Sequence, residues 1–83
     1  MKLFLISQNV NREYETFDLA VVVAESAEHA RMIHPSGERN WSGIEGQWPS
    51  WCDAKDVKVI ELGESIYGGA GDVVCASFNV GEI

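Results

Sequence analysis

The stretch "LAVVVAESAEHARMIH", residues 19–34, changes its hydrophobic period in the middle. Its first six residues are apolar and rich in valine, which is typical of a short strand buried on both faces. After residue 24 the apolar residues recur at helical spacing. Ser26 is a suitable N-cap, and Glu28 lies in the first turn, where a carboxylate suits the helix dipole. The stretch therefore predicts a central strand at 19–24 followed by a helix at 26–34.

The predicted helix has one apolar stripe and a defined end. Ala27, Ala30 and Ile33 recur on one side of it and are expected to be buried. Pro35 cannot continue a helix, and Gly37 follows it. A helix of this length is unstable alone, so it must pack on a sheet.

Three further strands are predicted around this unit, at 2–8 ("KLFLISQ"), 56–64 ("DVKVIELGE") and 72–80 ("DVVCASFNV"). A long loop at 9–18 makes the first two strands an antiparallel hairpin, and the glycine-rich segment 65–71 predicts a hairpin turn between the last two. Alternation in the last strand places four residues on the core face: Val74, Ala76, Phe78 and Val80. The chain is therefore expected to form one α+β domain over residues 1–83. Its order is ββαββ, with a four-stranded antiparallel sheet, one helix on one face and a long Trp-rich loop.

The Trp-rich loop, residues 35–54, contains all three tryptophans of the chain. Loops of this length inside a compact domain are uncommon and often functional. The central strands carry apolar residues on both faces, and one helix covers only one of them. The second face must be covered by the Trp-rich loop or by another chain, for which a homodimer is the simplest arrangement.

The tryptophans support more than one interpretation. Trp41, Trp48 and Trp51 could all roof the second sheet face and supply much of a small core. One or two of them could instead stay exposed as anchors for a partner, with an acidic rim steering a basic protein toward them. Trp48 suits an anchor best, because Gly46 and Pro49 favour a tight, projecting turn. A ligand pocket lined by the indoles is a third interpretation.

The charge balance restricts the kind of partner. Thirteen acidic and six basic side chains give a net charge of -7, and residues 41–83 carry seven acidic and only two basic ones. Binding to nucleic acid or an anionic membrane needs Lys and Arg, so both are disfavoured, whereas a basic protein surface is favoured. The predicted partner-binding residues combine the tryptophans with nearby acids: Trp48, Trp51, Trp41, Glu45, Asp53 and Asp56.

No catalytic residue, metal site or cofactor is predicted. His29 and His34 are five residues apart, which separates them on a helix, and with Cys52 and Cys75 they form no zinc spacing. They are interpreted as a surface histidine pair. Cys75 is expected to be buried in its strand and Cys52 to be the more accessible thiol, without a disulfide between them. The alternative function is a small-molecule-binding protein or minor enzyme, with Cys52 or a carboxylate as its reactive group.

The glycine-rich "YGGAGD", residues 67–72, lacks the following helix of a phosphate-binding loop. No apolar run approaches the ~20 residues of a membrane span. The start, "MKLFLISQ", lacks the apolar core and cleavage site of a signal peptide and suits a first strand. These features predict a cytoplasmic protein.

Three segments carry a resemblance to a known family: "MKLFLISQNVNREYETFDLAVVVAESAEHARMIHP", "WCDAKDVKVIELGE" and "VVCASFNVGEI". In these segments, which cover nearly the whole chain, the sequence resembles a family of short uncharacterised proteins of bacteriophage and prophage genomes. The resemblance implies a small accessory phage protein that acts inside a bacterial cell. Small acidic proteins in that setting are often inhibitors that occupy nucleic-acid-binding surfaces of host defence systems. The resemblance brings no activity and no functional residues to this chain.

Overall fold

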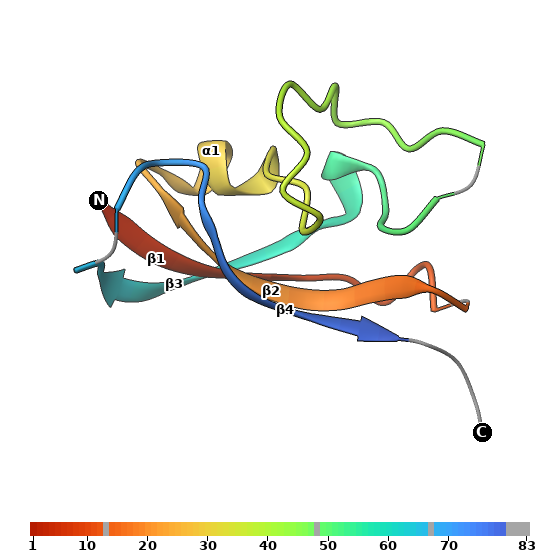
Figure 1. The fold of residues 1–83 in the computed structure, drawn as a ribbon, viewed down its shortest axis with the longest axis horizontal. Helices are drawn as coiled ribbons and strands as arrows, with labels where there is room; N and C mark the ends of the chain where they lie inside the picture. Colours follow the sequence, from red (N-terminus) through yellow and green to blue (C-terminus); the bar gives the residue numbers. More distant parts are fainter. Residues whose placement is uncertain (13, 48, 67, 80–83) are drawn as a thin grey trace.

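The computed structural model describes residues 1–12, 14–47, 49–66 and 68–79. Its elements follow the expected order, with four strands, β1 (Lys2–Ser7), β2 (Thr16–Ala24), β3 (Lys58–Glu64) and β4 (Val73–Asn79), one α-helix, α1 (Ala27–Arg31), and a short 3-10 helix, η1 (Ala54–Asp56). The strands form one antiparallel sheet, with α1 on one of its faces (Figure 1). The predicted α+β fold is therefore confirmed.

The helix begins as predicted but is shorter. The Ser26 side chain accepts a hydrogen bond from the His29 backbone N–H, as an N-cap does. Ile33 N–H then bonds to the Ala30 carbonyl, three residues back, so the last turn tightens and α1 ends at Arg31 and not at residue 34. Of the predicted stripe, Ala30 and Ile33 are buried, whereas Ala27 is exposed in the first turn.

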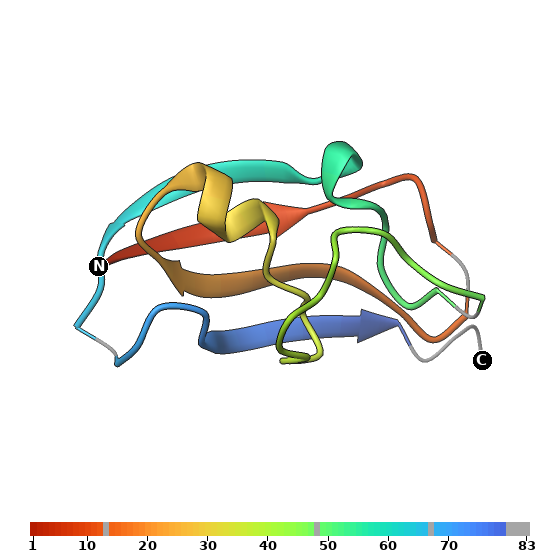
Figure 2. The same ribbon diagram turned by 90° about the horizontal axis from the view of Figure 1, so that it is seen from above.

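The second predicted hairpin is wrong. The strand order is β3-β1-β2-β4, so β3 pairs with β1, β4 pairs with β2, and the last two strands lie at opposite edges of the sheet. Residues 65–66 and 68–72, the described parts of this connection, therefore lie across one end of the sheet and do not form a hairpin turn (Figure 2). They are held there by backbone hydrogen bonds from Ser65 to Met1 and from Gly71 to Val23. Gly71 has a φ of 96°, which a side chain would disfavour.

The face assignment of β4 also needs correction. Ala76 pairs with Ala20 and Phe78 with Phe17, so both lie on the core side of the sheet as predicted, but both are exposed on this edge strand. A register shift between Val21 and Val22 of β2 disrupts the alternation of β4 at residues 73–75. As a result Val73, and not Val74, packs against the core. The fourth predicted core residue, Val80, lies outside the described residues.

The core lies on one face of the sheet only. Its members come from β1, β2, α1, the Trp-rich loop and η1: Phe4, Ile6, Ala20, Val22, Ala24, Ala30, Ile33, Trp41, Trp51, Cys52, Ala54 and Val57. Helix and loop thus cover the same face side by side (Figures 1 and 2). The prediction that the tryptophans roof the second face is wrong, because a five-residue helix is too small to cover the first face without the loop.

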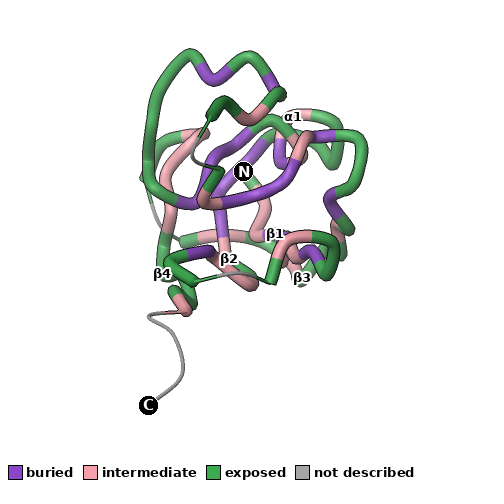
Figure 3. The backbone as a smooth tube through the Cα atoms, turned by 90° about the vertical axis from the view of Figure 1, so that its right-hand side faces the viewer, coloured by how far each residue is buried: buried purple, intermediate pink, exposed green. Residues whose placement is uncertain are grey.

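We call residues 25–57 the roof and the opposite side of the sheet the open face. Strand pairing places Leu3, Leu5, Leu19, Val21, Ile60 and Cys75 on the open face. Ile60 is 53% and Leu19 38% exposed, and β4 is exposed along most of its length (Figure 3). Within the described part of the chain, no helix is long and apolar enough to cross a membrane.

Candidate functional site

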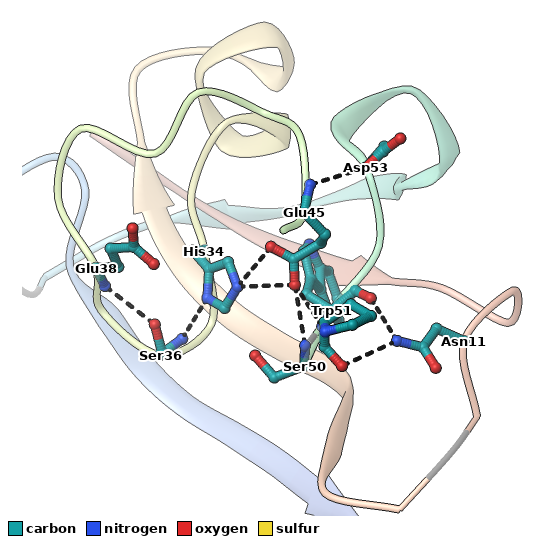
Figure 4. Close-up of polar contacts among 9 residues, drawn as sticks. Asn11, His34, Ser36, Glu38, Glu45, Ser50, Trp51 and Asp53 are labelled. Carbon is teal, nitrogen blue, oxygen red and sulfur yellow. Dashed lines mark hydrogen bonds and ion pairs between the residues drawn. The ribbon is translucent and has the colours of Figure 1, made fainter. Parts of the chain in front are cut away.

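The Trp-rich loop is organised by the carboxylate of Glu45. Glu45 Oε1 accepts hydrogen bonds from the backbone N–H groups of Ser50, at 3.1 Å, and Trp51, at 2.8 Å (Figure 4). Its two carboxylate oxygens also lie 3.3 Å from Nε2 of His34. The Glu45 backbone N–H in turn donates to Asp53 Oδ1 at 2.9 Å. The Glu45 side chain therefore joins the segment that follows α1 to the other arm of the loop.

His34 is a buried member of this network. Only 3% of the residue is exposed, so its interpretation as part of a surface pair is wrong. The Ser36 backbone N–H donates to Nδ1 of His34 at 3.1 Å, which makes Nδ1 an acceptor and leaves the proton on Nε2, facing Glu45. The imidazole also makes edge contacts with Phe17 and Trp41. Both ring nitrogens of His34 are occupied, so the imidazole offers no free nitrogen to a substrate.

Trp51 is held by both its backbone and its side chain. Its N–H donates to Glu45, its carbonyl accepts from the Asn11 side chain at 2.8 Å, and its indole is fully buried (Figure 4). Trp41 is 9% exposed. These two tryptophans are core residues and offer no protruding anchor. The third tryptophan, Trp48, lies outside the described residues.

The accessibilities of the two cysteines are the reverse of those predicted. Cys52 is buried and Cys75 is exposed on the open face, and both are free thiols. Burial raises the pKa of the Cys52 thiol from 9.0 to about 12, and the negative charges of Asp56, Asp53 and Glu45 add to this shift. At neutral pH Cys52 is therefore a protonated thiol, which is a poor nucleophile.

The structure brings most of the predicted site residues together, but their side chains bond and pack within the protein. Glu45 and Asp53 bond within the loop, Trp41 and Trp51 fill the core, and Asp56 is exposed on η1. Sequence reasoning missed His34 and Asn11. Their only signal is that both flank segments without regular structure, where backbone groups need side-chain partners. Among the described residues, no cluster of three or more His, Cys, Asp or Glu could hold a metal ion.

Comparison of the chain with protein-family models, curated proteins and solved structures finds no match.

The Glu45 network gives a stability prediction. Glu45→Gln keeps the shape but replaces one acceptor oxygen by an NH₂ group, which meets the N–H donors of His34 or the loop backbone. We expect this variant to lose about 1–3 kcal/mol of unfolding free energy, measured by urea denaturation. Glu38→Gln, on an exposed residue of the same loop, is the matched control and should stay within about 0.5 kcal/mol of the parent. Equal stability of the two variants would contradict a structural role for the Glu45 carboxylate.

Proposed function

We propose that this protein is a non-catalytic interaction module that docks through its roof on a basic surface of another protein. The observation that carries the proposal is the charge of the roof, which holds six carboxylates against three cations. Four of the carboxylates belong to exposed residues: Glu25, Glu28, Glu38 and Asp56. The roof can therefore attract a basic protein over a distance and discourage phosphate-bearing partners.

In the described part of the chain, the three cations of the roof leave most of its exposed carboxylates unpaired and available to a partner. The Arg31 guanidinium donates to the backbone carbonyls of Ala54 and Val57, tying η1 to the helix. Arg39 lies 3.4 Å from Asp72, outside the roof. Lys55 is the remaining cation, so the exposed field of the roof is dominated by carboxylates.

The proposal assigns the role of apolar anchor to Trp48. Trp41 and Trp51 are committed to the core, and in the sequence Gly46 and Pro49 beside Trp48 favour a tight, projecting turn. Tryptophan is enriched among the few residues that carry most of the energy of an interface. We infer that an acidic rim sets the association rate and that Trp48 sets the lifetime of the complex.

The resemblance to phage proteins suggests the setting. A host defence protein with a basic, nucleic-acid-binding surface would fit the roof, because carboxylates on the roof would take the place of phosphates there. In this proposal the protein is an inhibitor that acts inside the bacterial cytoplasm by occupying that surface.

Small-molecule binding is the alternative, and one observation favours it. The indole N–H groups of Trp41 and Trp51 are buried and have no acceptor among the residues that the structure describes. A ligand or water oxygen could satisfy them. Both indoles are nevertheless packed into the core, so a ligand would have to displace other side chains. The geometry therefore favours the interaction module.

Two variants of equal charge test whether the roof is the docking surface. The roof variant carries Glu28→Gln, Glu38→Gln and Asp56→Asn. The control carries Glu15→Gln, Glu61→Gln and Glu64→Gln, all on exposed residues outside the roof. Each variant has a net charge of -7 + 3 = -4. The parent and both variants are immobilised and used to capture proteins from bacterial lysate, which are identified by mass spectrometry.

We expect the parent and the control to retain the same basic protein and the roof variant to lose it. With the purified partner, association of the roof variant should be roughly tenfold slower. Trp48→Ala should instead speed dissociation and cost about 2 kcal/mol of binding free energy, with the melting temperature unchanged. Identical capture by all three proteins would rule out the roof as the docking surface.

A further inference from the structure

The open face is apolar, and the positions that strand pairing places on it carry no acid, although the chain is strongly acidic. Strand pairing places the apolar side chains of Leu3, Leu5, Leu19, Val21, Val23 and Ile60 on it, and of these Val23 is fully buried whereas Leu19 and Ile60 are exposed. The other positions that strand pairing places on this face include Ser7, Lys58 and Ser77, and none of them is Asp or Glu. With thirteen acidic residues in the chain, the exclusion of carboxylates from one face is a distinct feature of the surface.

Such a face is unusual for a sheet that remains exposed to water. Antiparallel sheets with one solvated face normally alternate apolar residues toward the core with polar residues outward. Here β1 and β2 present apolar residues in both directions, with Phe4 and Ile6 toward the roof and Leu3 and Leu5 away from it. The roof, the only layer of the described chain that covers the sheet, lies entirely on the other side (Figure 1). Contiguous exposed apolar patches of this kind mark interaction surfaces.

We propose that the open face is the contact between two copies of this chain, packed face to face about a twofold axis. The size of the face fits this occupant. Four strands spaced by ~4.8 Å span about 19 Å, and a seven-residue strand is about 23 Å long, which gives a footprint of about 440 Å² per copy. Two copies thus bury about 900 Å² when the two faces are treated as flat. That is just below the ~1,000 Å² that a stable, specific interface buries, so the dimer should be weak, reversible and concentration-dependent.

Charge also favours a second copy over a basic protein on this face. A basic partner would need carboxylates opposite its cations, and the open face has none at its paired positions. Two copies of net charge -7 repel each other, but face-to-face packing sets their roofs on opposite outer sides. The roofs are then separated by both sheets and the ~10 Å between them, beyond the Debye length of roughly 8 Å at physiological salt. The dimer would present two acidic roofs in opposite directions.

The test uses the purified chain alone, so its outcome is independent of the proposed function. The face variant carries Leu19→Lys and Ile60→Lys. The control carries Ile44→Lys in the roof and Ile66→Lys in the connection between β3 and β4, both on exposed residues. Both variants change the net charge equally, so a difference between them reports the position of the lysines. Circular dichroism checks that each variant is folded, and analytical ultracentrifugation at about 0.15 M salt measures mass against concentration.

We expect the parent and the control to pass from one to two chains as concentration rises, and the face variant to dimerise at least tenfold more weakly. A second readout uses Cys75, which lies on the open face opposite Val21. In the Cys52→Ala background, maleimide modification of Cys75 should slow as the parent dimerises and stay constant for the face variant. A parent that remains monomeric, a face variant that dimerises like the parent, or an assembly that continues beyond two chains would overturn the proposal.

Discussion

Trp51→Ala is expected to remove about 3–5 kcal/mol of unfolding free energy. Trp51 is fully buried in the core beneath the roof, and its backbone is bonded to Glu45 on one side and Asn11 on the other. The loop cannot collapse into the cavity without breaking these bonds. A domain of this size has only about 4–12 kcal/mol of stability in total. The variant should therefore be marginally folded.

Trp51→Phe distinguishes loss of volume from loss of the indole N–H. The indole N–H of Trp51 is buried without an acceptor in the described part of the chain, and an unpaired buried donor costs about 1–3 kcal/mol. Removing it offsets part of the smaller cavity left by phenylalanine. We expect Trp51→Phe to be folded and to lose less than about 2 kcal/mol in urea denaturation. If Trp51→Ala costs no more than Trp51→Phe, the indole does not support the roof.

Alkaline pH should destabilise the fold through Cys52. Burial, with the nearby carboxylates of Asp56, Asp53 and Glu45, raises the pKa of this thiol from 9.0 to about 12. Above pH 9 the unfolded chain releases the thiol proton while the folded chain keeps it. The stability present below pH 9 is therefore lost as pH rises toward 12, at about 1.4 kcal/mol per pH unit and by about 3–4 kcal/mol in all.

Cys52→Ala isolates this effect from the other groups that titrate in the same range. Unfolding free energies of the parent and the variant are measured from pH 8 to 11 at matched ionic strength. The difference between them should change by the slope given above, with the parent losing stability faster. At pH 8 iodoacetamide should modify the exposed Cys75 in the folded parent and leave Cys52 unmodified. Parallel pH profiles, or equal modification of both thiols, would contradict the burial of the Cys52 thiol.

Local patterns gave correct predictions wherever neighbouring residues decide the structure. The valine-rich run at 19–24 is the second half of β2, and Ser26 caps α1, because both depend on a few consecutive side chains. The turn between β3 and β4 was predicted wrongly, although it too has clear turn residues. A glycine-rich segment permits a hairpin and a longer connection equally well, and the pairing of β3 with β1 decides between them.

In the candidate site, too, the sequence predicts which residues share a segment, and the tertiary structure decides their contacts. The sequence placed Glu45, Asp53 and the tryptophans in one loop, and the structure brings most of them together. Their role differs from the prediction, because Glu45 meets the N–H groups of Ser50 and Trp51 and buries its charge among donors. His34 joins the same network from the end of α1, eleven residues away. Sequence spacing carries no information on which backbone groups a folded loop leaves unpaired.

The sequence by itself determined the ββαββ order, the capped start of α1, the acidic balance and the presence of apolar residues on both faces of the central strands. These properties follow from the period and charge of short segments. Only the tertiary structure decided which face the tryptophans cover, which cysteine is buried and which edge each outer strand takes. A five-residue helix covers only part of the sheet face on which it packs. The Trp-rich loop buries the rest of that apolar face, and it therefore lies on the same side of the sheet as the helix. Because the helix and the loop lie on the same face, the opposite face of the sheet is left uncovered by them.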